Sequence, residues 1–200
     1  MAKQKKGDLT RAIIITKSLP LFAVKGYFNT SVNDILKVTG LTKGGLYAHF
    51  DSKESIWYAV YDKAVVIWRY VLFNNLRSIS DPLKRTQVLI ERHMRDYIGF
   101  EVFKGGCFFV NSLIEVSGQS ESMTNCILKG FESYENLITS WIQDAREKNI
   151  LVENINPQAI GNFIVTCLYG SAALYSGSRK PEIWENSILQ LNFFINSLKK

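Results

Sequence analysis

Apolar residues recur at spacings of three and four through most of the chain, which marks one face of a helix in each stretch. The strict alternation that is typical of a half-buried strand does not stand out anywhere. Helical patterns run from Glu54 to about Leu76, from Asp81 to about Phe103, from Cys107 to Val116, from Ser120 to Lys148, from Asn156 to Ser178 and from Pro181 onward. With shorter patterns before Glu54, we expect an all-α protein of about nine helices.

The shorter patterns lie between Asn29 and Lys53. Thr30 or Ser31 is suited to cap a first helix, because a side-chain oxygen can accept one of the unpaired N–H groups there. Gly40 is placed where that helix must end, since glycine adopts the left-handed conformation without a steric penalty. Thr42 is well placed to cap the next helix. The sequence therefore predicts two short helices joined by a tight turn.

The second short helix, from Thr42 to about Phe50, has an unusual outer face. Leu46 and Phe50 are four residues apart and can pack inward together, which leaves mostly small or polar residues outside: Thr42, Lys43, Gly44, Gly45, Ala48 and His49. Such a face suits a recognition helix in the major groove of DNA. Adjacent glycines cost an isolated helix about 1 kcal/mol each relative to alanine, so they favour a site of close approach. The alternative is a helical hairpin whose glycines only form a turn.

About the first quarter of the chain contains the order Thr10-Arg11, Leu21-Phe22-Ala23, Lys25-Gly26-Tyr27, Thr30-Ser31-Val32, Asp34-Ile35, Gly40-Leu41-Thr42-Lys43-Gly44, Leu46-Tyr47, His49-Phe50 and Ser52-Lys53-Glu54. This order resembles the N-terminal domain of TetR-type transcriptional repressors. Leu36 departs from the family, which usually has alanine there. Pro20 departs as well, and we expect it to kink or weaken the first helix.

The resemblance implies a three-helix DNA-binding domain followed by a larger helical domain for effector binding and dimerisation. It assigns phosphate contacts to Tyr47 and Lys53, with help from Thr30 or Ser31 at a helix N-terminus. Lys43 and His49 are our candidates for contacts to base edges or to neighbouring phosphates. We place the boundary between residues 1–53 and residues 54–200.

The charge distribution agrees with this division. The 200 residues carry a net charge of +6, and residues 1–54 hold nine Lys/Arg against four Asp/Glu. A basic surface is expected where phosphates bind. Lys3, Lys5 and Lys6 form either a mobile arm that contacts DNA or a solvated tail. We find no apolar run of the ~18–20 residues that cross a bilayer, and no signal-peptide pattern, so we expect a cytoplasmic protein.

The last two helical patterns predict a homodimer. Both carry apolar residues on more than one face, which requires burial on two sides, and the family resemblance implies a four-helix interface. We expect that interface to include Phe163, Cys167, Ser171, Leu174, Trp184, Ile188, Leu191 and Ile195. The alternative is two ordinary core helices of a monomer. A two-fold dimer would recognise an inverted-repeat operator.

Aromatic residues are frequent in the middle of the chain. They are either plain core or the lining of an apolar pocket for an aromatic or lipophilic inducer, which the family often has. The candidates for effector binding are Trp68, Tyr97, Phe100, Cys107, Phe108, Asn111, Glu115, Phe131, Tyr134 and Trp141. The sequence does not name the ligand.

Cys107 has a second interpretation. It follows Gly105-Gly106 at a predicted helix start, where the helix dipole lowers the pKa of a thiol. The segment is similar to a branch of the TetR-type family with Gly-Cys at the start of the sixth helix, and some members of that branch sense electrophiles or oxidants. The alternative is a buried and inert cysteine.

Other functions have weaker support. An enzyme could use Cys107 or a serine with His93 and Glu115, but the sequence shows no Gly-rich phosphate loop, nucleophile elbow or metal-ligand spacing, and we expect no cofactor. A nucleoid-type DNA-binding protein without a ligand is a third alternative. We interpret the chain as a homodimeric repressor that a small apolar ligand, or modification of Cys107, releases from DNA.

Overall fold

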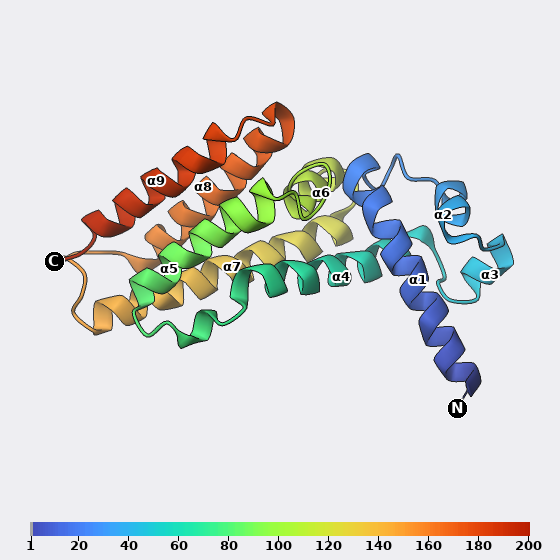
Figure 1. Cartoon of the computed structure of the whole chain (residues 1–200), viewed down its shortest axis with the longest axis horizontal. Coiled ribbons are helices and arrows are strands. Elements are labelled where there is room, and N and C mark those ends of the chain that lie inside the picture. The colour runs from blue at the N-terminus through green and yellow to red at the C-terminus, as the bar shows by residue number, and fades with distance from the viewer. Residues whose placement is uncertain (1) are drawn as a thin grey trace. The chain divides into compact units, whose positions relative to one another are not determined.

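The computed structural model describes the backbone of residues 2–200 and the side chains from residue 7 onward. The side chains of Lys3, Lys5 and Lys6 lie outside this described part. Within it, the structure has nine α-helices, one 3₁₀ turn and one π-helix, and a single isolated β-bridge joins Leu151 to Lys199 (Figure 1). The expected all-α fold is confirmed.

The first compact unit extends to Trp68. It contains α1 (Ala2–Lys25), α2 (Val32–Thr39), α3 (Lys43–Tyr47) and most of α4 (Lys53–Phe73). Its core is made of residues from all four helices: Ile14, Phe22, Ile35, Leu46, Ile56, Trp57 and Val60 are almost completely buried. α1 continues in one helical segment through Pro20, whose side chain is exposed.

The ends of α2 and α3 follow from local side-chain chemistry. Ser31 caps α2 by accepting the N–H of Asp34, and Gly40 ends that helix in the left-handed conformation, with φ of 72°. Thr42 caps α3 by accepting the N–H of Gly45. These caps are as predicted, with Ser31 and not Thr30 at the first one. α3 ends at Tyr47, before the predicted Phe50, because the next residues form a turn.

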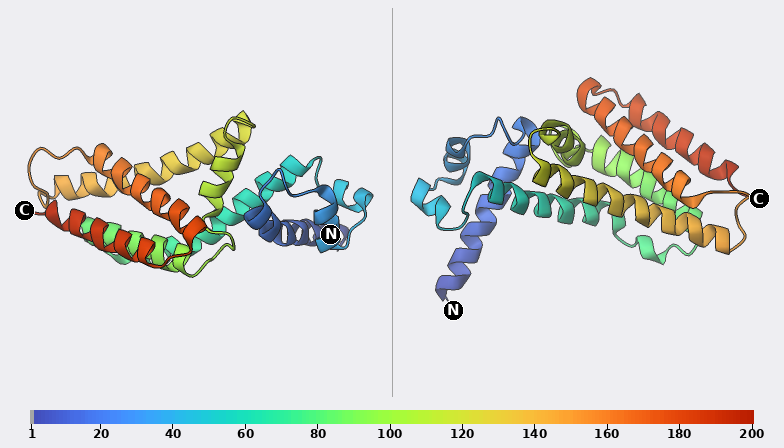
Figure 2. Two further views of the ribbon diagram at one scale, coloured as in Figure 1. Left: turned by 90° about the horizontal axis from the view of Figure 1, so that it is seen from above. Right: turned by 180° about the vertical axis from the view of Figure 1, so that it is seen from behind.

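The second compact unit starts at Arg69. After α4 it contains η1 (Leu76–Ser78), α5 (Pro82–Glu91), η2 (Arg92–Gly99), α6 (Phe108–Val116), α7 (Glu121–Glu147), α8 (Pro157–Ser178) and α9 (Glu182–Ser197). The long helix α7 packs against α5, α6 and α8. α8 and α9 lie side by side, and α9 also packs against α5 and η2 (Figure 2).

The helix predicted from Asp81 to Phe103 is interrupted. After α5 the backbone changes to the π-helix η2, in which the N–H of Phe100 bonds the carbonyl of Arg95, five residues earlier. The helical segment ends at Gly99, and Glu101 then takes a positive φ of 48°. The buried residues His93, Met94, Tyr97 and Ile98 recur four apart, a spacing that an α-helix also accommodates, so the sequence does not reveal the π-helix.

Candidate functional site

The outer face of α3 is exposed, and the two apolar residues behind it are buried. Leu46 and Phe50 form part of the core, whereas Lys43, Gly44 and Tyr47 are open to solvent. A methyl group added at Gly44 would meet no atom within 4 Å. At Gly45 it would lie 3.3 Å from the Thr42 hydroxyl oxygen, against the turn. The exposed face of α3 is therefore low at Gly44, in the sense that no side chain projects there, and Lys43 and Tyr47 lie beside it.

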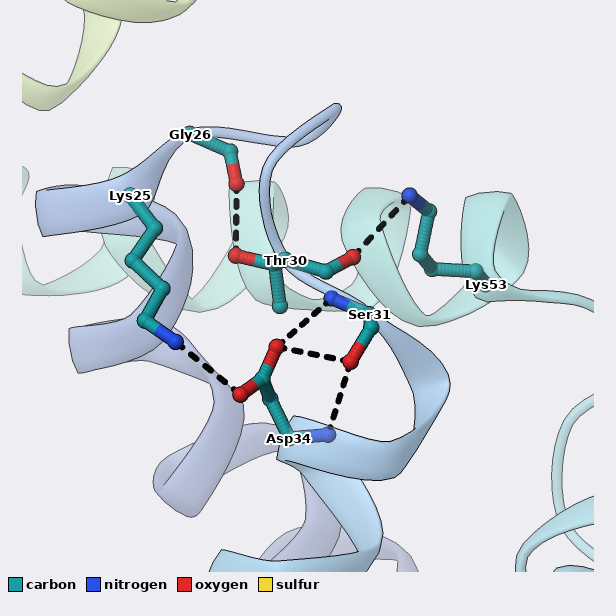
Figure 3. Close-up of polar contacts among 6 residues, drawn as sticks. All are labelled: Lys25, Gly26, Thr30, Ser31, Asp34 and Lys53. Atoms are coloured by element: carbon teal, nitrogen blue, oxygen red, sulfur yellow. Dashed lines mark hydrogen bonds and ion pairs between the residues drawn. The ribbon is translucent and has the colours of Figure 1, made fainter.

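The other predicted residues of this surface differ in exposure. Thr42, Ala48 and Ser31 are exposed, and His49 is half-buried. Thr30 is fully buried, and its hydroxyl donates a hydrogen bond of 2.6 Å to the carbonyl of Gly26 (Figure 3). The Thr30 side chain thus closes the turn between α1 and α2.

Lys53 connects the turn between α1 and α2 to the start of α4 through hydrogen bonds. Its Nζ donates to the carbonyls of Tyr27, at 2.8 Å, and Thr30, at 3.0 Å (Figure 3 shows the second bond). The ammonium group also lies 4.2 Å from the centre of the Tyr27 ring, within the range of a cation–π contact. Lys53 therefore organises the backbone that leads into the Ser31 cap.

Asp34 holds that cap from the other side. Its carboxylate accepts the backbone N–H and hydroxyl of Ser31, at 2.9 and 2.7 Å, and the ammonium of Lys25 at 2.9 Å (Figure 3). The hydrogen bond from the Ser31 hydroxyl, followed by that from Lys25, holds the pKa of Asp34 well below its usual range. The start of α2 is thus fixed relative to α1 and to α4.

A second group of chemically distinctive residues lies in the second unit, where polar atoms meet inside a set of aromatic rings. His93 Nδ1 is 3.1 Å from the hydroxyl of Tyr134, and the hydroxyl of Tyr97 is 3.5 Å from the sulfur of Cys107. The ring of Tyr169 lies 5.8 Å from that of His93, centre to centre. We call His93, Tyr97, Cys107, Tyr134, Tyr169 and Phe131 the aromatic cluster; Phe131 stacks on Tyr169 at 4.0 Å.

Cys107 is completely buried, as the N-cap residue of α6. Burial raises the pKa of its thiol, and the opposing effect of the N–H group of Val110 is smaller. The expectation of a lowered pKa is therefore wrong: loss of solvent outweighs the helix N-terminus. The residue before Cys107 must be a glycine for a steric reason, because a Cβ at Gly106 would lie 1.9 Å from the hydroxyl oxygen of Ser176 on α8.

Of the predicted effector residues, Tyr97 contacts Cys107 directly, and Tyr134 is connected to Tyr97 through His93. Phe131 stacks on Tyr169, whose ring also lies near that of Tyr134. Phe108 contacts Phe103 and Phe109 nearby.

The remaining predicted effector residues have other surroundings. Phe100 is exposed, Glu115 is half-buried, and the Asn111 side chain bonds the carbonyl of Gly105. Trp141 lies beside the guanidinium of Arg85, and Trp68 is the last residue of the first unit.

His93 and Tyr169 were not among the predicted effector residues. A signal for His93 exists in the sequence, since it precedes Tyr97 by four residues in an apolar pattern, but it does not distinguish a core histidine from a binding one.

α8 and α9 present an exposed apolar surface. Phe163 and Leu174 of α8, and Leu189 and Phe193 of α9, project into solvent; Leu174 is 66% exposed and Phe193 is 73% exposed. We call these four residues the α8–α9 surface.

The other residues of the predicted dimer interface are less exposed. Ile188, Leu191 and Ile195 are buried within the chain itself, while Cys167, Ser171 and Trp184 are half-buried. By length and composition alone α8 is apolar enough to cross a membrane, but one such helix is weak support for a membrane protein, because a core helix passes the same test.

Comparisons with known proteins agree on one family. The family model for the N-terminal domain of bacterial regulatory proteins of the tetR family matches residues 14–60, and that for the tetracyclin repressor-like C-terminal domain matches residues 82–187. An uncharacterized HTH-type transcriptional regulator of Lactococcus lactis is 28% identical over 179 residues, which is 89% of each chain. The HTH-type transcriptional repressor DhaR of a Mycobacterium species is 26% identical, over 80% of this chain and 79% of its own.

Solved structures have the same fold. A TetR-family regulator from Cytophaga hutchinsonii superimposes with a TM-score of 0.87 at 21% identity, covering 97% of this chain and 96% of its own. A cysteine mutant of the regulator CifR, in complex with operator DNA of 26 bp, gives a TM-score of 0.75 at 16% identity, covering 94% and 95%. With both domains matched by family models, this chain belongs to the TetR family of bacterial transcriptional regulators.

Proposed function

We propose that this protein is a cytoplasmic homodimeric repressor that binds an inverted-repeat operator through α3 and is released by a small apolar or aromatic molecule. The observation that carries the proposal is the low, exposed face of α3, with Gly44 open to solvent and Leu46 buried behind it. Two relatives support it: DhaR is a repressor by name, and CifR was solved with operator DNA.

On the DNA, Gly44 lets the backbone of α3 approach the floor of the major groove, together with Gly45 and Thr42. Lys43 and Tyr47 are exposed on either side of Gly44 and contact base edges or phosphates, and His49 lies at the edge of this surface. Ser31 adds a contact at the start of α2. Lys53, through its bonds to Tyr27 and Thr30, holds this region in shape and contributes its charge.

The dimer forms through the α8–α9 surface. Large apolar side chains at 66% and 73% exposure are costly in water, and a second copy of the same two helices would cover them in a four-helix arrangement. Two-fold symmetry then presents two recognition helices to two related half-sites, which accounts for the inverted repeat.

The role of Lys43 gives a direct test of the DNA surface. Lys43→Ala should weaken binding to operator DNA and reduce its dependence on salt concentration, whereas the control Lys129→Ala, on an exposed part of α7, should change neither. Fluorescence anisotropy with a labelled operator measures both effects. Equal affinities of Lys43→Ala and the unaltered protein would contradict the proposed surface.

Release follows from a difference in ligand affinity between two conformations. An inducer must favour the non-binding conformation by a few kcal/mol. α4 is continuous along the chain from the first unit into the second, so it is the element through which a change in the second unit would act. A protein that binds DNA without any effector is the alternative, and its operator affinity would not respond to small molecules.

Modification of Cys107 is the second proposed route to release. Its thiol is completely buried and its pKa is raised, which favours the unreactive protonated form. Modification would therefore require a local opening around α6. If Cys107→Ser abolished release by a quinone or by hypochlorite, this route would be supported; unchanged release would exclude it.

A further inference from the structure

We infer that the aromatic cluster is the effector site, and that it takes an uncharged aromatic molecule whose hydroxyl group hydrogen-bonds Nε2 of His93. This inference rests on the proposed function, because it gives the chemical class of the inducer. It is built on four features of the described residues: the π-helix, an unpaired nitrogen, the neutrality of the surroundings and the exposed edge of the cluster.

The π-helix η2 supplies two residues of the cluster. His93 and Tyr97, four residues apart, both face the interior, with Met94 and Ile98 beside them. π-helical turns, with i→i+5 hydrogen bonds, are rare in proteins. Those that occur are frequently found at functional sites. His93 and Tyr97 of this segment enter the same aromatic surroundings, where their rings are 5.5 Å apart.

His93 keeps one hydrogen-bonding atom without a partner. Its Nδ1 is paired with the Tyr134 hydroxyl, while Nε2 is buried and has no hydrogen-bond partner. Buried polar atoms are normally paired, so an orphan in a protein core needs an explanation. A neutral imidazole offers either a donor or an acceptor at Nε2, depending on its tautomer. A ligand hydroxyl satisfies both cases, because it can donate and accept.

The surroundings of His93 exclude a charged ligand. Its neighbours on η2, α7 and α8 are the rings of Tyr97, Tyr134 and Tyr169, and Cys107 lies beyond Tyr97. Burial lowers the pKa of His93 to about 3 and raises those of Tyr97, Tyr134 and Cys107, so these four groups are uncharged at neutral pH. A carboxylate or an ammonium would lose its hydration without gaining an opposite charge.

The cluster reaches the surface at one pair of rings. Phe131 of α7 and Tyr169 of α8 are both half-buried and stack at 4.0 Å, and Tyr169 is also in contact with the His93 ring. We place the access for the ligand there. A flat aromatic molecule suits this position, since it can stack on the same rings that now stack on each other.

Three naphthalene probes test the chemistry with the full-length protein at neutral pH: 2-naphthol, naphthalene and 2-naphthoate. We expect 2-naphthol to bind at least about tenfold more tightly than naphthalene, because only the hydroxyl can satisfy Nε2. The anionic 2-naphthoate should bind more weakly than both. Calorimetry or fluorescence titration gives the three affinities.

Nitrogen NMR of histidine locates the binding. The sequence has two histidines, His49 and His93, so ¹⁵N-histidine labelling gives few signals. Addition of 2-naphthol should shift the Nε2 signal of His93 and leave His49 unchanged. His93→Phe, which keeps a ring but no nitrogen, should bring the affinity for 2-naphthol down to that for naphthalene. The control Trp141→Phe, an aromatic residue outside the cluster, should have no effect.

The outcomes separate this inference from the proposed function. Equal affinities for 2-naphthol and naphthalene, or an unchanged His93 signal, would overturn the inferred site while operator binding by the free protein remained intact. If His93→Phe no longer bound 2-naphthol more tightly than naphthalene, the inferred site would be supported. If that variant does not fold, the shift of the His93 signal in the unaltered protein decides whether the site is correct. Failure of the free protein to bind any operator would contradict the proposed function instead.

Discussion

We propose that Gly44 contributes to DNA binding because it has no side chain. A methyl group there would meet nothing within 4 Å in the free protein, and alanine favours a helix over glycine by about 1 kcal/mol. Gly44→Ala should therefore raise the free energy of unfolding by up to about 1 kcal/mol, yet weaken operator binding by about tenfold, because the methyl group projects toward the DNA. Chemical denaturation and fluorescence anisotropy on the same sample measure both. Improved stability with unchanged affinity would show that DNA does not approach Gly44.

Lys53 and Lys43 make a matched pair of lysines with different roles. Lys53→Met keeps the aliphatic stem but removes two hydrogen bonds to the carbonyls of Tyr27 and Thr30. We expect it to lower the free energy of unfolding by about 1–3 kcal/mol, since hydrogen bonds from a charged donor are the stronger kind. Lys43→Met, on an exposed residue, should leave stability within about 0.5 kcal/mol of the unaltered protein. Urea denaturation distinguishes them, and equal stabilities would remove the organising role of Lys53.

Local and distant contacts explain which residue roles the sequence could predict. The caps at Ser31, Gly40 and Thr42 depend on atoms within a few residues, so the sequence identifies them. Lys53 donates a hydrogen bond to a carbonyl 26 residues away. Cys107 is shielded from solvent by residues distant in the sequence, such as Tyr97 and Ser176. Such surroundings exist only after folding, which is why the lysine's bonds and the raised pKa of the thiol were not foreseen.

At the scale of the element, the strongest prediction concerns dimerisation through α8 and α9. Leu174→Asp should convert the proposed dimer to a monomer, because it places a charge on the α8–α9 surface. The control is Ile114→Asp on α6, since Ile114 is 67% exposed against 66% for Leu174. Sedimentation at micromolar concentration gives the mass of each variant. A dimer that survives Leu174→Asp, or an unaltered protein that is already monomeric, would contradict the α8–α9 surface.

The buried His93 of the π-helix η2 makes the free energy of unfolding depend on pH. Burial lowers the pKa of His93 from 6.5 to about 3, so the unfolded chain binds a proton there at a higher pH than the folded one. The contribution is fully present above pH 6.5 and is lost as the pH falls toward 3, at up to about 1.4 kcal/mol per pH unit. Carboxylates add their own dependence, and the difference between the unaltered protein and His93→Phe isolates the histidine. Parallel pH profiles of the two proteins would contradict a neutral, buried His93.

The limits of prediction differ between these elements. Ile188, Leu191 and Ile195 of α9 were expected at the dimer interface, but in the structure they are buried in the chain's own core. The exposed residues Leu189 and Phe193 were not among the predicted interface residues. Periodicity identifies an apolar face without saying what covers it. The π-helix was missed for a related reason, since its residues keep nearly the same apolar spacing as an α-helix.

At the scale of the whole molecule, the sequence was most informative about the family and the helical layout. The motif matches from Thr10 to Glu54 are dense enough to identify the N-terminal domain, and the order of helices followed from periodicity and caps. The aromatic cluster was predicted only in part. Tyr97, Cys107 and Tyr134 do meet, but from three separate segments, and the pairing with His93 depends on tertiary packing that one sequence does not encode in its spacing.

Selection of binding sites from random DNA tests the central claim most directly, because it requires both the α3 surface and the dimer. With the reduced full-length protein at moderate salt, we predict enrichment of one inverted repeat of two half-sites. The enriched site should lose affinity on Gly44→Ala and on Leu174→Asp, for different reasons. Enrichment of a single half-site would contradict the dimer, and no enrichment at all would contradict a repressor that binds its operator without a ligand.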